Sequence, residues 1–398
     1  MKRLPLLLLL LLVLPLRGFG SGTLSAEGIQ ALEEMVDGAI GEQRITAAIA
    51  VIEIDGEIQW LYAAGEMEPG VPMRQDPILP LASVGKMFTA TATMILYERG
   101  VIDLDEPVSR FIPEFDQAMV AIKVDDQTAT VPAHRPITVR HLLTHTAGFV
   151  VDGDDFWTVW DAHVGKTTTT DFARDLLALN LQSQPGERFD YGQTGAAYEV
   201  LGAVIEIASG ESLEAFMFEN IFVPLDLQDS YFYLPAEKSD RLPAVYRKVN
   251  GQLMLDRPAG EDFSRSTFFH GGGGVRSAPA DVLKFAGMFL NGGVVDGTRL
   301  LKAETVEMMM SDQLGDLASE DWASHGRSWG FGAAVVFSDP QANSGIPDRY
   351  GWVGGGFAKL WIDPKNRLLA YLNFPLTPPG DNELLREFER RVYSAIDP

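Results

Sequence analysis

Segments with the pattern of β-strands stand near both ends of this 398-residue chain, and a long helical stretch separates them. Residues 48–54 and 57–63 are rich in strand-forming side chains. They are joined by Asp55-Gly56, a dipeptide that accepts the positive φ angles of a tight hairpin turn. Three more strands are predicted late in the chain, at residues 332–337, 357–362 and 368–374. Early and late strands can share one sheet only if the chain between them is an insertion.

Helical patterns flank and divide these strands. Ser25 can cap a helix with apolar residues at helical spacing, and residues 384–396 carry an apolar stripe that Asp381 or Asn382 can cap. Residues 84–99 are small or apolar on nearly every face, which indicates a buried helix that ends at Gly100. The following region mixes helical stretches with loops rich in Pro and Gly.

These patterns predict an α+β fold, with an antiparallel five-stranded sheet flanked by terminal helices and a mainly helical inserted lobe. We expect residues 21–80 together with 265–398 to form the sheet lobe, and residues 81–264 to form the helical lobe. An active cleft is expected between the two lobes.

The first 20 residues have the composition of a signal peptide. Lys2 and Arg3 precede an apolar run, residues 4–16, and small residues follow up to Gly20. The run is shorter than the roughly 20 apolar residues that a transmembrane helix needs. We therefore expect cleavage near Gly20, a periplasmic or secreted location, and no stable membrane insertion of the mature chain.

The charge and the lack of cysteine exclude several functions. A chain with a net charge of −23 repels nucleic acid and anionic lipid, so no nucleic-acid partner is expected. Without cysteine the chain has no disulfide, no thiol nucleophile and no cysteine-ligated metal. The sequence implies no metal and no cofactor, and it leaves the oligomeric state open.

Ser83-Val84-Gly85-Lys86 is the single S-x-x-K sequence of the chain and stands where the buried helix is expected to begin. The i,i+3 spacing puts the hydroxyl and the amine on one face of a helix. A serine becomes a nucleophile when a neighbouring group accepts its proton. Two interpretations stay open on this motif alone: a nucleophile with its base, or a helix cap followed by a solvated lysine.

Over most of its length the chain resembles the serine β-lactamase and penicillin-binding protein family, specifically the class C β-lactamases and the family VIII carboxylesterases. The S-x-x-K motif of that family implies that Ser83 is the nucleophile and Lys86 its proton partner. The family's Y-x-N motif is similar to Tyr191-Gly192-Gln193. It implies that Tyr191 also carries protons and that Gln193, in place of the usual Asn, contacts the substrate. The resemblance implies the β-lactamase/transpeptidase-like version of the α+β fold.

The third family motif is similar to Trp352-Val353-Gly354, which we expect just before a strand. The β-lactamases of the family have K-T-G or H-x-G here, whereas the esterases have W-x-G. The resemblance implies that Trp352 and Gly354 contact the substrate. It also implies that the backbone N–H groups of Ser83 and Gly355 form the oxyanion hole, which commonly gives the largest single catalytic contribution.

Trp352 presents an apolar face where the carboxylate of a β-lactam or a peptide needs a cation. Arg349, three residues upstream, is an alternative source of positive charge. We therefore expect an exported serine hydrolase that acts on a small-molecule ester or amide, and a carboxylesterase for short-chain or small acyl esters fits best. A β-lactamase or D-amino-acid peptidase, and a non-catalytic binding protein that keeps the fold, remain alternatives.

Other motif matches fail on their context. Ser328 lies in a G-x-S-x-G sequence, but a polar loop is expected before it, a strand after it, and the last histidine of the chain is His325. His270 begins an H-x-G sequence that precedes a helix, and Tyr371 begins a Y-x-N sequence inside an apolar strand. Residues 141–148 also carry the resemblance and are interpreted as architectural.

Overall fold

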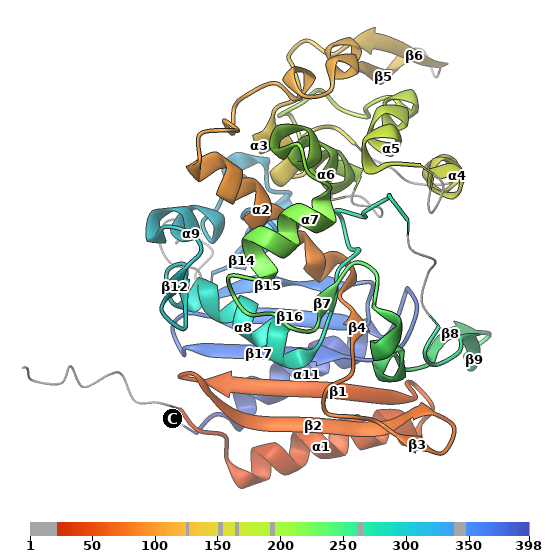
Figure 1. Cartoon of the computed structure of the whole chain (residues 1–398), viewed down its shortest axis with the longest axis vertical. Coiled ribbons are helices and arrows are strands. Elements are labelled where there is room, and N and C mark those ends of the chain that lie inside the picture. The colour runs from red at the N-terminus through yellow and green to blue at the C-terminus, as the bar shows by residue number, and fades with distance from the viewer. Residues whose placement is uncertain are drawn as a thin grey trace, which may run out of the picture.

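The computed structural model describes residues 22–124, 127–149, 154–163, 167–191, 196–261, 266–337 and 348–397. Within these residues an eight-stranded antiparallel sheet brings both ends of the chain together, in the order β13-β14-β15-β16-β17-β1-β2-β3 (Figure 1). Its strands are β1 (Ala47–Ile54), β2 (Glu57–Glu68), β3 (Val71–Pro72), β13 (Arg327–Trp329), β14 (Ala334–Val336), β15 (Arg349–Gly354), β16 (Ala358–Asp363) and β17 (Leu368–Asn373).

β1 joins the early strands to the late ones. Val51 pairs with Tyr371 of β17 on one side and with Leu61 of β2 on the other. The strand is buried along almost all of its length, as its run of Ala, Ile and Val residues requires. Asp55 and Gly56 turn the chain into β2 with φ angles of 54° and 82°, as the sequence predicts.

Helices cover both faces of the sheet. The terminal helices α1 (Ala26–Gly41) and α11 (Asn382–Ala395) pack against each other, and α8 (Pro279–Leu290) packs against β1, β16 and β17. On β15, Tyr350 contacts Phe289 of α8 with ring centroids 5.1 Å apart, whereas the neighbouring Arg349 pairs with Glu389 of α11. Neighbouring strand residues point to opposite faces, so α8 and α11 lie on opposite sides of the sheet.

A lobe in which helices predominate lies above the sheet in Figure 1. Its helices are α2 (Lys86–Glu98), α3 (Val139–Leu143), α4 (Asp154–His163), α5 (Thr169–Asp175), α6 (Ala196–Ser209) and α7 (Leu213–Met217). The insertion also contains the hairpins β5 (Met119–Val124) with β6 (Gln127–Pro132) and β8 (Val245–Val249) with β9 (Gln252–Arg257). The remaining elements are α9 (Ala303–Met309), α10 (Glu320–Ser324), β4 (Leu79–Pro80), β7 (Ser230–Tyr231), β10 (Arg276–Ser277), β11 (Val294–Val295) and β12 (Thr298–Arg299).

The predicted α+β fold with an antiparallel sheet between terminal helices is confirmed, but the count of five strands is wrong. In the described part of the chain the sheet also contains β3, β13 and β15. β15 carries Gly351 and Gly354, which weaken a strand pattern in sequence, and β3 and β13 are only two and three residues long. The division into lobes at residues 81 and 264 stays a prediction.

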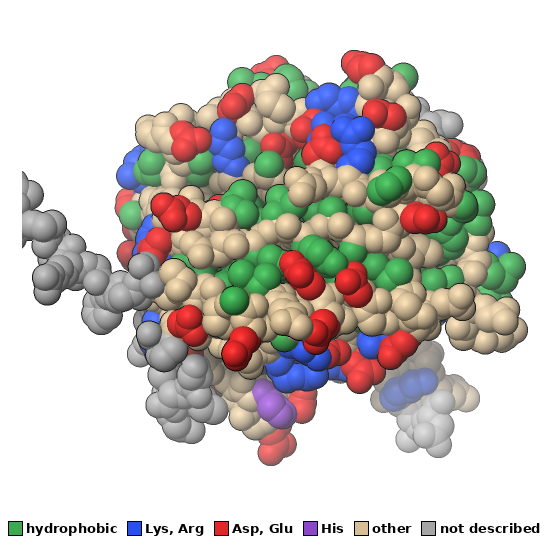
Figure 2. All heavy atoms as spheres, turned by 90° about the horizontal axis from the view of Figure 1, so that it is seen from below, with side chains coloured by type: hydrophobic (Ala, Val, Ile, Leu, Met, Phe, Trp, Pro, Cys, Tyr) green, Lys and Arg blue, Asp and Glu red, His purple; other side chains and the backbone are tan. Residues whose placement is uncertain are grey.

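The surface charge, the helices and the N-terminal residues can each be compared with the predicted export. Seen from below, Asp and Glu side chains are spread across the face of the molecule (Figure 2), in keeping with the net charge of −23. In the part of the chain that the structure describes, no helix combines the length and the apolarity needed to cross a bilayer. The predicted signal peptide, residues 1–20, lies outside the described residues, so export stays a prediction.

Asp381 ties three separate segments together at the start of α11. Its carboxylate accepts hydrogen bonds from Arg44 at 2.9 and 3.0 Å, from Lys248 at 3.1 Å and from the N–H of Leu384 at 3.0 Å. Its own N–H donates to the carbonyl of Gly356 at 2.7 Å. Burial would raise the pKa of the Asp381 carboxyl, but the hydrogen bonds from Arg44, Leu384 and Lys248 outweigh it and hold the pKa below its usual range.

Asp381→Ala is expected to lower the free energy of unfolding by about 2–4 kcal/mol, because two cations lose their partner and α11 loses its cap. Since the pKa is lower in the folded chain, the stabilisation is present above the unfolded pKa of about 3.9 and is lost as the pH falls below it. Urea titrations at pH 7 and pH 3 measure both effects.

The control for this experiment is Asp240→Ala, which removes an exposed ion pair with Arg74. Its cost is expected to stay within about 1 kcal/mol. An equal loss of stability in Asp381→Ala and Asp240→Ala at pH 7 would contradict the interpretation of Asp381 as a structural anchor.

Candidate active site

Ser83 and Lys86 meet at the junction of the sheet and the helical lobe. Ser83 lies in a short 3₁₀ turn, Ala82–Gly85, that leads directly into α2. The Lys86 Nζ donates a hydrogen bond to Ser83 Oγ at 3.0 Å and another to the carbonyl of Gly272 at 2.8 Å. Lys86 is only 1% exposed, and Ser83 makes no capping hydrogen bond to the helix. The interpretation of this motif as a cap with a solvated lysine is therefore wrong.

Tyr191 and Trp352 complete the arrangement of the three motifs. The Lys86 Nζ lies 5.4 Å from the centre of the Tyr191 ring. The indole N–H of Trp352 donates a hydrogen bond to the Tyr191 hydroxyl at 2.8 Å. Lys86, Tyr191 and Trp352, one residue from each of the three motifs, thus lie close together although they are far apart in sequence. Gln193 of the second motif lies outside the described residues.

The end of β15 approaches the serine turn closely. A Cβ on Gly354 would lie 2.2 Å from the carbonyl oxygen of Leu81, so only glycine fits there. Gly355 follows with a φ angle of 57°, and among the described residues no hydrogen-bond acceptor takes its N–H. Trp352-Val353-Gly354 precedes a strand, β16, as expected, but these residues also form the last part of β15, a strand that the sequence did not predict. Gly355 directly follows Gly354, the residue that approaches the serine turn, and its role in an oxyanion hole stays a prediction.

Aromatic rings pack around Trp352 on one side of the site, and one of them, Trp329, is fully buried. The Trp352 ring centroid lies 4.9 Å from Tyr191, 4.8 Å from Trp329 and 5.9 Å from Trp322. We call Trp322, Trp329 and Trp352 the tryptophan wall. Trp329 and Trp322 were not identified from the sequence, because single tryptophans in a short strand and a short helix carry no motif.

His145, in the segment interpreted as architectural from the sequence, packs against the site. It is 4% exposed and its ring packs against Tyr191 and Tyr198, with centroids 4.7 and 5.0 Å apart. Its Nε2 has no hydrogen-bond partner among the described residues. Burial, with the nearby Lys86 cation second, holds the pKa of His145 well below its usual value, so the imidazole is neutral at pH 7. The 141–148 segment therefore packs directly against Tyr191, and its interpretation as architectural stays a prediction.

Arg349 does not reach the site. Its guanidinium pairs with Glu389 of α11 and lies 5.6 Å from the Tyr393 ring centre. Because Arg349 and Trp352 are three residues apart on β15, they point to opposite faces of the sheet. The sequence-based expectation that Arg349 could supply a positive charge to the site is therefore wrong.

The competing motif matches lie in structural positions. Ser328 is buried in β13 and donates a hydrogen bond to Asp312. Tyr371 is buried in β17, where its hydroxyl accepts a hydrogen bond from Asn373 at 2.8 Å. The His270 ring contacts the buried Glu199 and does not open a strand.

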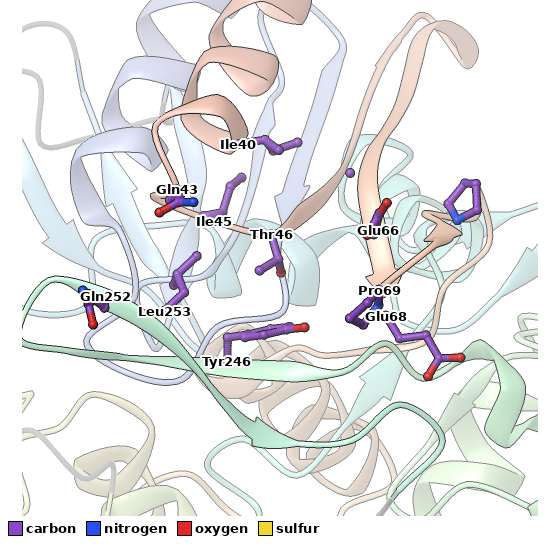
Figure 3. Close-up of a pocket in the computed structure, with 12 residues that line it drawn as sticks. Ile40, Gln43, Ile45, Thr46, Glu66, Glu68, Pro69, Tyr246, Gln252 and Leu253 are labelled. Atoms are coloured by element: carbon purple, nitrogen blue, oxygen red, sulfur yellow. The ribbon is translucent and has the colours of Figure 1, made fainter.

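A hollow of about 750 Å³ lies elsewhere, between the turn after α1, the end of β2 and the β8–β9 hairpin (Figure 3). Figure 3 shows Thr46, Glu66 and Tyr246 around it. Ser83 and Lys86 do not line this hollow, so it is separate from the site of the three motifs.

Proteins of known family match this chain over most of its length. A family model described as Beta-lactamase matches residues 30–393. Esterase EstB from Burkholderia gladioli is 30% identical, over 83% of this chain and 86% of its own. ML-236A carboxylate methylbutanoyltransferase mlcH from Penicillium citrinum is 28% identical, over 92% of this chain and 95% of its own. The solved structure of unliganded simvastatin synthase (LovD) from Aspergillus terreus has a TM-score of 0.75 and 25% identity, and covers 93% of this chain and 99% of that one.

Fold, site and relatives define a serine hydrolase or acyltransferase. The chain belongs to the beta-lactamase family.

Gly354→Ala is expected to slow acylation of Ser83 by about 10²-fold, because the added methyl group pushes β15 away from the serine turn and moves the Gly355 N–H. The rate of labelling by a fluorophosphonate probe measures this loss. Gly287→Ala on α8 is the matched control, since a Cβ there meets no atom within 4 Å. Equal labelling rates in the two variants would contradict the close approach as a requirement of the site.

Proposed function

We propose that the protein is a carboxylesterase that hydrolyses small, neutral acyl esters through an acyl-enzyme on Ser83. The observation that carries this proposal is the hydrogen bond from the Trp352 indole to the Tyr191 hydroxyl, directly beside the Ser83–Lys86 pair. An indole stands where a carboxylate-binding enzyme of this family needs a cation.

The charges around the site support a neutral substrate. Lys86 is buried and already bonded to Ser83 and to the carbonyl of Gly272. Arg349 is paired with Glu389 on the opposite face of the sheet. A substrate carboxylate that lost its water against the tryptophan wall would lie in an apolar environment, which is costly for a charge without a partner.

The proposed reaction has two steps. Ser83 Oγ attacks the ester carbonyl carbon and the hydroxyl proton passes through Lys86 and Tyr191 to the leaving alkoxide, so the bond from the carbonyl carbon to the alcohol oxygen breaks and the alcohol leaves. A water molecule then attacks the acyl group, its proton returns to Ser83, and the carboxylic acid is released. The backbone N–H groups of Ser83 and Gly355 bind the oxyanion in both steps. Either Lys86 or Tyr191 can serve as the base.

Transfer of the acyl group to an alcohol is the second candidate function. It replaces water by an alcohol in the second step and needs no further residue. The relatives support both outcomes, because one is named an esterase and another a methylbutanoyltransferase. A β-lactamase or D-amino-acid peptidase would use the same Ser83 acyl-enzyme, and a binding protein would form none.

Ser83→Ala is expected to abolish fluorophosphonate labelling and to lower p-nitrophenyl butyrate turnover by at least about 10³-fold, because the acyl group has no other acceptor. Ser328→Ala is the matched control and is expected to retain both activities. The proposal is wrong if Ser328→Ala loses labelling while Ser83→Ala keeps it, and an inert wild type would support the binding protein.

Substrate charge gives a second test with a matched pair of substrates. We expect kcat/KM for p-nitrophenyl butyrate to exceed that for p-nitrophenyl hemisuccinate, which has a terminal carboxylate, by about 10²-fold or more, because the carboxylate finds no cation. Nitrocefin, which also carries a carboxylate, is expected to be a poor substrate. Preference for the hemisuccinate or fast nitrocefin turnover would favour the β-lactamase or peptidase.

A further inference from the structure

A buried carboxylate stands behind the lysine of the site. Glu199 on α6 is 0% exposed, and its two carboxylate oxygens accept the N–H groups of Gly271 at 3.1 Å and Gly272 at 2.9 Å. The His270 Nδ1 also contacts one of these oxygens. A carboxylate buried to this degree is costly unless its partners compensate it, and no step of the proposed reaction involves it directly.

The Gly271–Gly272 segment connects Glu199 to Lys86. The Gly272 carbonyl accepts the hydrogen bond from Lys86 Nζ at 2.8 Å. The preceding peptide group is held at both ends, since its carbonyl, on Gly271, accepts a hydrogen bond from Thr89 Oγ1 at 2.6 Å and its N–H, on Gly272, donates to Glu199. Glu199 and Thr89 therefore fix the orientation of the residue that holds the amine.

The packing around this segment leaves it little freedom. A Cβ on Gly271 would lie 2.3 Å from the carbonyl oxygen of Tyr198, so the segment lies directly against α6. Lys86 is 1% exposed, so water does not replace the Gly272 carbonyl if it moves away. A shift of the segment would leave the amine without one of its two acceptors.

We propose that Glu199 is a positioning residue that orients Lys86 for proton exchange with Ser83 through the Gly271–Gly272 segment. The inference rests on the proposed role of Lys86. A carboxylate suits this position because it has acceptors only and meets two converging N–H donors. Only Gly272 separates the Glu199 carboxylate from the Lys86 amine, since it bonds to both. This region is shielded from water, and charges interact more strongly there than in solution.

Glu199→Gln tests the proposal, because its amide has one acceptor and a donor that faces one of the two N–H groups. We expect the maximal rate of fluorophosphonate labelling of Ser83 to fall about 10²-fold, with apparent probe affinity within about threefold of the wild type. The acid limb of the pH profile of labelling is expected to move to lower pH, because the protonated amine loses a nearby anion. A residue with only a structural role would not move that limb.

Glu206→Gln is the matched control for this variant. Glu206 lies on the same helix, is half-buried and accepts the N–H of Leu213 at 3.1 Å, but it does not contact the glycine segment. The proposal would be overturned if Glu199→Gln and Glu206→Gln had the same labelling rate and the same acid limb in the pH profile. Because the probe reports activation of Ser83 and not ester preference, this result is independent of whether the enzyme favours neutral esters.

A second pair of variants keeps the proposal testable if Glu199→Gln does not fold. Thr89→Val removes the hydrogen bond to the Gly271 carbonyl and is expected to slow labelling about tenfold. Thr91→Val, on the same helix, removes an equally buried hydroxyl that bonds to the Met87 carbonyl at 2.8 Å. Equal labelling rates in Thr89→Val and Thr91→Val would show that the segment does not position Lys86.

Discussion

The buried amine of Lys86 is the constraint on which the rest of the site depends. An amine with three N–H bonds can be held away from water only if the protein supplies acceptors at the right distance. Here the acceptors are Ser83 Oγ and the Gly272 carbonyl, which come from segments almost 190 residues apart. The serine turn and the segment around Gly272 must therefore both be in place before the Lys86 amine has its two acceptors.

The sheet explains how such distant segments meet. β1 pairs with β17, so the two ends of the chain form one layer, and α8, which belongs to the intervening chain, packs against that layer. β15 ends against the serine turn, and the Gly356 carbonyl that follows it accepts the N–H of Asp381 at the start of α11. The loop that carries Gly355 is thus anchored to a terminal helix and, through Arg44 and Lys248, to two further segments.

The sequence predicted those parts of the molecule that have a periodic or continuous apolar pattern or that carry a motif. Alternating or continuous apolar runs identified β1, β2, β16 and β17, and the S-x-x-K spacing identified Ser83 and Lys86. β15 escaped because two glycines remove the strand pattern: Gly354, which the close approach to Leu81 requires, and Gly351, which lies against Leu360. Glu199, and the contact of His145 with Tyr191, escaped for another reason. A single buried polar residue has no periodicity, and its role depends on partners that only the tertiary structure brings near.

In the proposed esterase, Trp352 affects how the site distinguishes substrates by their charge and by the length of their acyl chain. Its N–H is used on Tyr191, and its ring joins Trp322 and Trp329 in the tryptophan wall. An apolar wall rejects a charged group strongly, because the charge loses its water and gains no partner. The same wall distinguishes acyl chains that differ by one methylene by only about 1–3 kcal/mol. In the esterase proposed above, the wall would therefore select against charged acyl groups, and neutral acyl groups would differ by how well each one fills the space beside the wall.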